Sequence, residues 1–348
     1  MNPYILAILL SGLGLGTTIT FASSHWLLAW MGLEMNTLAI LPLMAQHHHP
    51  RAVEATTKYF ITQAAAAAML LFASTTNAWL SGQWSIEETS HPLLVTTLTL
   101  ALALKLGLAP LHAWLPEVLQ GLDLSTGLIL STWQKLAPLT LLLQIQATNT
   151  TLLIILGLIS TLVGGWGGLN QTQLRKILAY SSIAHLGWMV LILQFSPPLT
   201  LLTLMTYLIM TSSMFLAFKL NKTTNINSLA SSWAKMPALT ALAPLILLSL
   251  GGLPPLTGFM PKWLILQELT KQDLALTATI AALTALLSLY FYLRLSYAMT
   301  LTMSPNNLPA TTPWRLSSNQ FSLPLAFFTT TSLLLLPMTP TLSVLTLP

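Results

Sequence analysis

One apolar stretch of the chain, residues 92–120, reads PLLVTTLTLALALKLGLAPLHAWLPEVLQ and is interrupted by Gly107 and Pro110. A spanning helix needs roughly 20 mostly apolar residues, so this stretch is too long for one straight membrane crossing. Residues 238–270 form a second long apolar stretch, which the segment GGLPP at 251–255 breaks. Helices broken by Gly and Pro at matching positions of two halves mark the transport path in secondary transporters.

The composition is that of a polytopic membrane protein. Hydrophobic types make up 54% of the 348 residues and charged types only 6%, and the mean hydropathy is +0.73. Soluble domains carry about 25% charged residues, which excludes a soluble enzyme and a disordered chain. The net charge of +5 arises from scarce acids and not from a basic patch, so no nucleic acid is expected as a partner. The absence of cysteine excludes thiolate metal sites and iron–sulfur clusters in this chain.

The apolar runs predict an all-α polytopic fold of eleven spanning helices in a single membrane domain, residues 1–348. The first five helices form one repeat, 1–145, and the next five form a second, 150–302, before a C-terminal helix at 322–345. Because five is odd, the two repeats are inverted in the membrane, and each has its broken helix in fourth place. The expected spans are 3–22, 25–45, 58–80, 92–120, 124–145, 150–169, 176–195, 199–220, 238–270, 274–302 and 322–345.

The charges in the predicted loops test this order. One side of the membrane receives nine basic residues: Arg51, Lys58, Arg175, Lys176, Lys219, Lys222, Lys235, Arg294 and Arg315. The other side receives only Lys271. Such an asymmetry follows the positive-inside rule and would be lost if a helix had been miscounted. The N-terminus is therefore expected inside and the C-terminus outside.

Four charged residues remain within the apolar spans: Glu34, Lys105, Lys135 and Lys262. Each costs about 2.5–3.5 kcal/mol on insertion scales, which makes a functional role the default interpretation. A structural ion pair is the alternative, but one glutamate cannot neutralise three lysines. A buried lysine readily changes its protonation state, whereas arginine does not. Because no carboxylate cluster suggests a sodium site, these residues favour a proton path.

Two further features are interpreted as neither a metal site nor a targeting signal. The run His47-His48-His49 is expected in a solvated loop, because no acidic residues accompany it as second-shell partners of a metal site. The first apolar run lacks a basic leader, so we expect it to be a retained membrane helix and not a cleaved signal.

Three motifs resemble those of the antiporter-like subunits of respiratory complex I. They are residues 104–117 (LKLGLAPLHAWLPE), 176–187 (KILAYSSIAHLG) and 251–263 (GGLPPLTGFMPKW). The opening MNP and residues 30–36 (WMGLEMN) resemble one member that is encoded in animal mitochondrial DNA. The resemblance covers the whole chain and implies two inverted five-helix bundles that conduct protons within a large complex.

The resemblance carries over to single residues. Glu34 matches the family's glutamate, and Lys105 matches the lysine of the first broken helix. Lys135 matches the central lysine of the next helix, and Lys262 matches the basic residue of the second broken helix. His112 matches a histidine of the first break. We expect Lys105 and Lys135 to exchange protons through water, with Lys262 on the exit side. Glu34 would control the charge of Lys105. His185 receives no assigned role.

The resemblance also implies the surroundings of the chain. It binds no cofactor itself, and NADH, FMN, iron–sulfur clusters and ubiquinone are expected in other subunits. The expected partners are the other membrane and accessory subunits of complex I, including neighbouring antiporter-like subunits, and lipids, with cardiolipin a candidate. The expected location is the mitochondrial inner membrane, with the N-terminus in the matrix and the C-terminus toward the intermembrane space.

Three other functions are weighed against this one. A free-standing cation/proton antiporter would share inverted repeats and buried charges but would work without electron-transfer partners. A purely structural subunit would not need three lysines within the membrane. A quinone-binding subunit would need a polar mouth with His and Tyr near one interface, which the sequence does not suggest.

Overall fold

The computed structural model describes residues 2–46, 49–89, 91–145, 149–234, 236–301 and 322–341, and every regular element within these ranges is a helix. The predicted all-α membrane class is confirmed, whereas the count of eleven crossings and the inverted repeats stay predictions. Six of the described helices are long and apolar enough to span a membrane: α1 (Pro3–Ala22), α2 (Trp26–Met44), α3 (Pro50–Ser81), α8 (Thr150–Gly167), α10 (Pro197–Asn221) and α14 (Ala275–Thr300).

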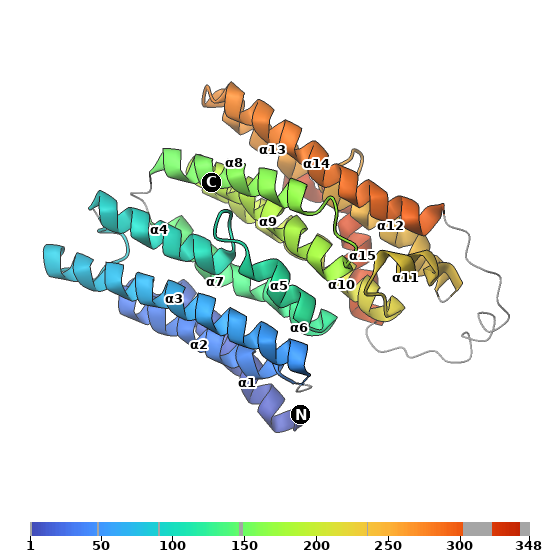
Figure 1. Cartoon of the computed structure of the whole chain (residues 1–348). Helices are drawn as coiled ribbons and strands as arrows, with labels where there is room; N and C mark the ends of the chain where they lie inside the picture. Colours follow the sequence, from blue (N-terminus) through green and yellow to red (C-terminus); the bar gives the residue numbers. More distant parts are fainter. Residues whose placement is uncertain are drawn as a thin grey trace. The chain divides into compact units, whose positions relative to one another are not determined.

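The chain forms two compact units, Met1–Gly157 and Leu158–Pro348. In unit 1, α2 packs between α1 and α3 (Figure 1). Helices α1 and α2 approach closely at Gly16 and Gly32, where a side chain would meet the facing backbone, as small residues permit in membrane helices. The shorter helices of unit 1 are α4 (Pro92–Leu106), α5 (Trp114–Gly121), α6 (Leu124–Ser131) and α7 (Trp133–Gln144).

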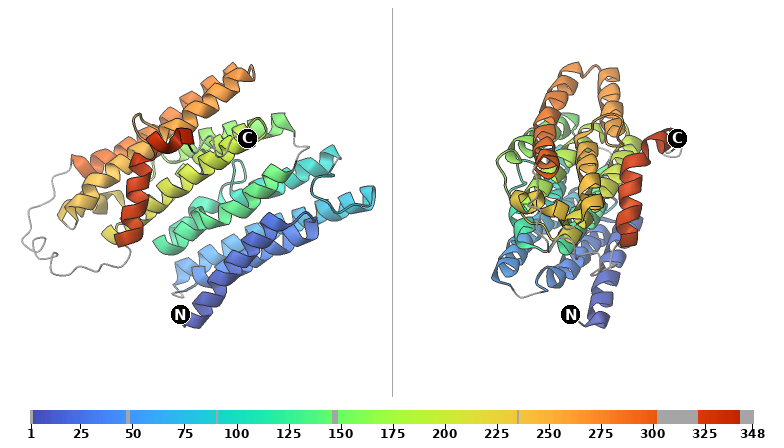
Figure 2. Two further views of the ribbon diagram at one scale, coloured as in Figure 1. Left: turned by 180° about the vertical axis from the view of Figure 1, so that it is seen from behind. Right: turned by 90° about the vertical axis from the view of Figure 1, so that its right-hand side faces the viewer.

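In unit 2, α10 occupies a central position. It contacts α9 (Leu174–Ile192), α12 (Pro237–Gly251), α13 (Phe259–Lys271) and α15 (Ser322–Leu334), and α12 lies along α14 (Figure 2). A short helix α11 (Ile226–Ala230) and the turn η1 (Ser232–Ala234) follow α10, and η4 (Leu336–Met338) follows α15. The connection between α8 and α9 is joined to the end of α10 by backbone hydrogen bonds, from Leu174 N to Thr224 O (3.0 Å) and from Ile226 N to Thr172 O (3.2 Å).

Both predicted helix breaks are confirmed. Helix α4 ends at Gly107, which has a φ of 77° and donates its N–H to Ala103 O (2.9 Å) and Leu104 O (3.1 Å). Helix α12 ends in the same way at Gly252, with a φ of 81° and an N–H that donates to Ser249 O (2.9 Å). Glycine adopts this left-handed conformation without the Cβ clash that other residues suffer, and so it ends a helix.

Three predicted boundaries are wrong. The span 124–145 is not one helix, because α6 and α7 are separated at Thr132, whose hydroxyl donates to Leu128 O (2.7 Å). Such back-bonding bends helices. The span 58–80 begins earlier, at Pro50, where proline suits the first helical turn. The C-terminal span ends at Leu334, just before Pro337 in η4, and its residues 342–345 lie outside the described part of the chain.

Candidate functional site

Two of the predicted buried charges form an ion pair in unit 1. Lys105 lies in the last turn of α4, and its Nζ is 3.8 Å from Oε1 of Glu34 on α2. The lysine side chain is 2% exposed and the glutamate side chain 23% exposed. The Thr37 hydroxyl, which donates to the backbone carbonyl of Glu34 (2.9 Å), also lies 3.1 Å from Oε2 of that glutamate. The carbonyl end of α4 also favours a positive charge at Lys105, because the helix dipole is negative there.

Lys135 lies on the opposite side of the same helix break. It belongs to the first turn of α7 and is 1% exposed. Its ammonium group donates a hydrogen bond to the carbonyl of Leu106, one of the groups left without a partner where α4 ends. The same nitrogen is 5.6 Å from the ring centroid of Trp114, within the range of a cation–π contact.

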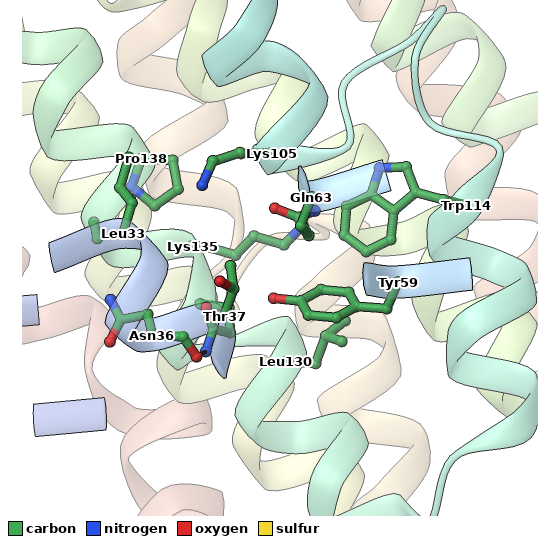
Figure 3. Close-up of a pocket in the computed structure, with 12 residues that line it drawn as sticks. Leu33, Asn36, Thr37, Tyr59, Gln63, Lys105, Trp114, Leu130, Lys135 and Pro138 are labelled. Atoms are coloured by element: carbon green, nitrogen blue, oxygen red, sulfur yellow. Dashed lines mark hydrogen bonds between the residues drawn. The ribbon is translucent and has the colours of Figure 1, made fainter. Parts of the chain in front are cut away.

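A small polar cavity, with about 10 Å³ of space for water, is lined by both lysines (Figure 3). It is lined by residues of six helices, and Figure 3 shows Lys135 extending toward Gln63 and Trp114 and Lys105 pointing toward Pro138. Its lining residues are Leu33, Asn36, Thr37, Tyr59, Gln63, Lys105, Trp114, Leu130, Gln134, Lys135, Ala137 and Pro138. Both lysines therefore line the same small polar cavity of unit 1.

The amide side chains around this cavity favour a hydrated interior. Oδ1 of Asn36 and Nε2 of Gln63 are buried and make no hydrogen bond within the described residues. Gln134 donates its Nε2 to the backbone carbonyl of Asn36 (3.3 Å). Buried polar groups are nearly always satisfied, and a polar cavity does so with water. The cavity thus offers hydrogen-bond donors and acceptors beside both lysines.

Unit 2 has a lysine at its own helix break. Lys262, on α13, donates its Nζ to the carbonyls of Gly251 (2.8 Å) and Leu250 (3.4 Å) at the end of α12. In both units a lysine thus neutralises the carbonyl end of the first half-helix. In unit 1 that lysine comes from a separate helix, α7, and in unit 2 it comes from the second half-helix.

The structure describes His112 and His49 of the histidines that the sequence singles out. His112 lies in the connection between α4 and α5, and its ring interacts with the backbone of Pro110. It does not line the cavity of Lys105 and Lys135. In the histidine run, His47 and His48 lie outside the described residues, and the described histidines and acids form no group able to hold a metal ion.

Comparisons with known proteins assign the chain to a family. Residues 23–288 match the family described as NADH:quinone oxidoreductase/Mrp antiporter, TM, and residues 289–343 match NADH dehydrogenase subunit 2 C-terminus. NADH-ubiquinone oxidoreductase chain 2 of Tetraodon nigroviridis is 77% identical over 340 residues, 98% of each chain. The chain belongs to the NADH-ubiquinone oxidoreductase chain 2 family. The relative from Gadus morhua, which bears the same name, is 72% identical over 348 residues and the full length of both chains.

A solved structure from a bacterium is also similar to this chain 2 family member. A chain in a structure of respiratory complex I from Thermus thermophilus with bound aureothin has a TM-score of 0.83 and 27% identity. The match covers 97% of this chain and 80% of that chain. The predicted recognition of the family is therefore confirmed.

The sequence interpretation missed several residues of the site in this chain 2 family member. Asn36, Gln63 and Gln134 were not assigned a role, although each is an amide within an apolar span. Polar side chains at such positions point to helix contacts or to a hydrated path. This signal was present in the sequence, because Asn36 stands two residues after Glu34 and Gln134 stands directly before Lys135. Tyr59 and Trp114 gave no comparable signal, because aromatic residues are common in apolar helices.

Proposed function

We propose that this chain is a proton-translocating membrane subunit of respiratory complex I, which couples NADH-to-ubiquinone electron transfer to proton movement. The observation that carries the proposal is the pair Glu34–Lys105 beside a polar cavity that Lys135 also lines. Three charged groups in the apolar interior of one unit oppose membrane insertion, so they require a function. Relatives named chain 2 and the likeness to a complex I chain support the same assignment.

The proposed route runs from Lys105 through cavity water to Lys135. Glu34 controls the first step, because its charge holds the proton on Lys105. At an effective dielectric near 20, opposite charges 3.8 Å apart attract by about 4 kcal/mol, and at about 8 Å by about 2 kcal/mol. A small movement of α2 relative to α4 is thus sufficient to release the proton toward Lys135. Lys262 is the proposed group on the exit side, and His112 stays a candidate beside the first break.

The fold supports the proposed inverted repeats. The two breaks share a register, with Gly107, Pro110 and Pro116 in one matching Gly252, Pro255 and Pro261 in the other. We further propose eleven crossings, with the basic loops and the N-terminus in the mitochondrial matrix and the C-terminus toward the intermembrane space. The charge asymmetry of the loops supports this orientation.

The remaining parts of the complex supply the redox chemistry under this proposal. Without cysteine this chain has no thiolate for an iron–sulfur cluster. The family resemblance implies that the flavin, the clusters and the sites for NADH and ubiquinone belong to other subunits. Its partners are the neighbouring membrane subunits, the accessory subunits and lipid, with cardiolipin a candidate for the basic loops.

A native gel after mild detergent extraction tests the proposal against a free-standing antiporter. The gel is stained for NADH oxidation and probed with an antibody to this chain. Migration with a very large NADH-oxidising band is the expected result. A small band without that activity would instead support the antiporter and overturn the proposal.

A further inference from the structure

Trp114 is the first residue of α5, the second half of the broken helix in unit 1, and its side chain lines the cavity that Lys105 and Lys135 share. The side chain is 7% exposed. A buried indole ring commonly serves packing, and its N–H then needs one acceptor. The contacts of this ring with the end of α4 and with Lys135 point to a further role.

The indole is fixed to the end of α4. Its Nε1–H donates to Leu104 O (3.0 Å), one of the carbonyls that lose their helical partner where α4 ends. The ring also lies beside Gly107, where an added Cβ would be 3.3 Å from a ring carbon. From α3, Tyr59 meets the ring of Trp114 in a T-shaped arrangement, with 5.7 Å between the ring centroids. The ring is therefore held by contacts with two other helices.

Lys135 is held by the same helix end. Its Nζ donates to Leu106 O, two residues after the carbonyl that accepts the indole hydrogen bond. The same nitrogen lies over the ring of Trp114, 5.6 Å from the ring centroid. Because the indole and the ammonium group bind neighbouring carbonyls of one helix end, the backbone of α4 fixes their relative position.

The ring takes the place of an acidic partner for Lys135. Within the described part of the chain, Lys105 pairs with Glu34, whereas Lys135 forms no ion pair. A carboxylate at the 3.8 Å of the first pair favours a protonated lysine by roughly a thousandfold at an effective dielectric near 20. A cation–π contact in a desolvated site favours it by on the order of tenfold. The weaker partner suits a group that has to take up a proton and also release it.

The second helix break offers an internal comparison. In the register that aligns Gly107 with Gly252, Phe259 stands at the position of Trp114. Lys262, the lysine of that break, lies on the second half-helix itself and donates to two carbonyls of α12. The indole thus occurs at the break whose lysine reaches in from a separate helix, and for which the structure describes one carbonyl acceptor.

We propose that Trp114 is a positioning residue for proton transfer in unit 1, and that its indole face stabilises the protonated form of Lys135 and holds the ammonium group at the cavity. The neutral amine takes a proton from cavity water, becomes an ammonium over the ring, and returns to the amine when it gives that proton up. The ring itself is unchanged. This role rests on the proposed function, because it needs a lysine that carries protons.

The test uses the complete complex, reconstituted into vesicles, with Trp114→Phe and Trp114→Leu. Phenylalanine keeps an aromatic face and removes the N–H, whereas leucine removes both. Trp79→Leu is the matched control, because Trp79 lies on α3 of the same unit and is 88% exposed. We expect the step through Lys135 to slow by on the order of tenfold in Trp114→Leu and by less in Trp114→Phe, since phenylalanine attracts a cation less strongly than tryptophan. Protons pumped per NADH oxidised then decrease, whereas the control keeps the wild-type value.

The pH dependence of pumping separates this role from a structural one. A higher proton concentration protonates Lys135 by mass action, so the deficit of Trp114→Leu relative to wild type narrows as the pH on both sides of the vesicle membrane is lowered. A helix end that is misplaced because the bond to Leu104 O is lost stays misplaced at every pH. The other titratable groups that line the cavity, Lys105 on α4 and Tyr59 on α3, are the same in all of these variants.

A native gel establishes which variants assemble, and if Trp114→Leu does not, the pH dependence of Trp114→Phe decides. Equal deficits in both variants that do not change with pH would overturn the role of the ring face, and so would wild-type pumping in both. Decreased pumping in Lys135→Met would then leave the proposed function intact. Wild-type pumping in Lys135→Met as well would overturn both.

Discussion

Replacing Glu34 by glutamine removes the charge that faces Lys105 and keeps the shape of the side chain. At 3.8 Å and an effective dielectric near 20, the attraction lost is about 4 kcal/mol. Solvent screens part of it, because the glutamate side chain is 23% exposed, and the glutamine carbonyl still accepts a hydrogen bond. If about 2 kcal/mol of the attraction between Glu34 and Lys105 is lost, the rate of a proton-transfer step that depends on this pair decreases about thirtyfold.

The assay for Glu34→Gln is proton uptake per NADH oxidised by the complex in sealed vesicles. Glu54→Gln is the control, since Glu54 pairs with Lys58 at an exposed site. We expect Glu34→Gln to pump fewer protons per NADH while the complex still assembles. Wild-type stoichiometry and rate in this variant would refute the role of the pair.

Three further variants test other parts of the account. Gly107→Ala forces a side chain into a residue with a φ of 77° and toward Trp114, so we expect a loss of about 1–2 kcal/mol in stability and less assembled complex on a native gel after mild heating. Gln63→Leu removes one hydrogen bond to cavity water, which contributes about 1 kcal/mol. We expect proton transfer in the vesicle assay to slow about fivefold. An unchanged rate would contradict a hydrated cavity. Lys58→Met breaks only exposed ion pairs with Glu54 and Glu117. We therefore expect proton pumping, and the temperature at which the complex disappears from a native gel, to stay at wild-type values.

The helix breaks could be predicted from sequence because their cause is local. Gly107 and Gly252 are the residues that adopt the left-handed conformation, and prolines follow both. The interruption at Thr132 could not be predicted in this way. The hydroxyl bond from Thr132 to Leu128 is no marker of a break, because Thr76 makes the same kind of bond within the unbroken helix α3.

The candidate site was predictable in its charges and not in its contacts. Glu34, Lys105 and Lys135 stand out because charge is rare in apolar spans. That Lys135 donates to Leu106 and lies against Trp114 depends on how α7 packs on α4 and α5, which a pattern along one helix does not contain. The cavity amides give only a weak signal, because amides also occur at simple helix contacts.

The most direct test of the central claim is the number of protons pumped per NADH oxidised by complex that contains Lys135→Met. Methionine fills similar space without a charge, and Lys58→Met serves as the matched control at an exposed site. A native gel establishes that both variants assemble. We predict that Lys135→Met lowers the proton yield or the turnover of the complex and that the control changes neither. An assembled Lys135→Met complex with wild-type proton yield and turnover would contradict the lysine route.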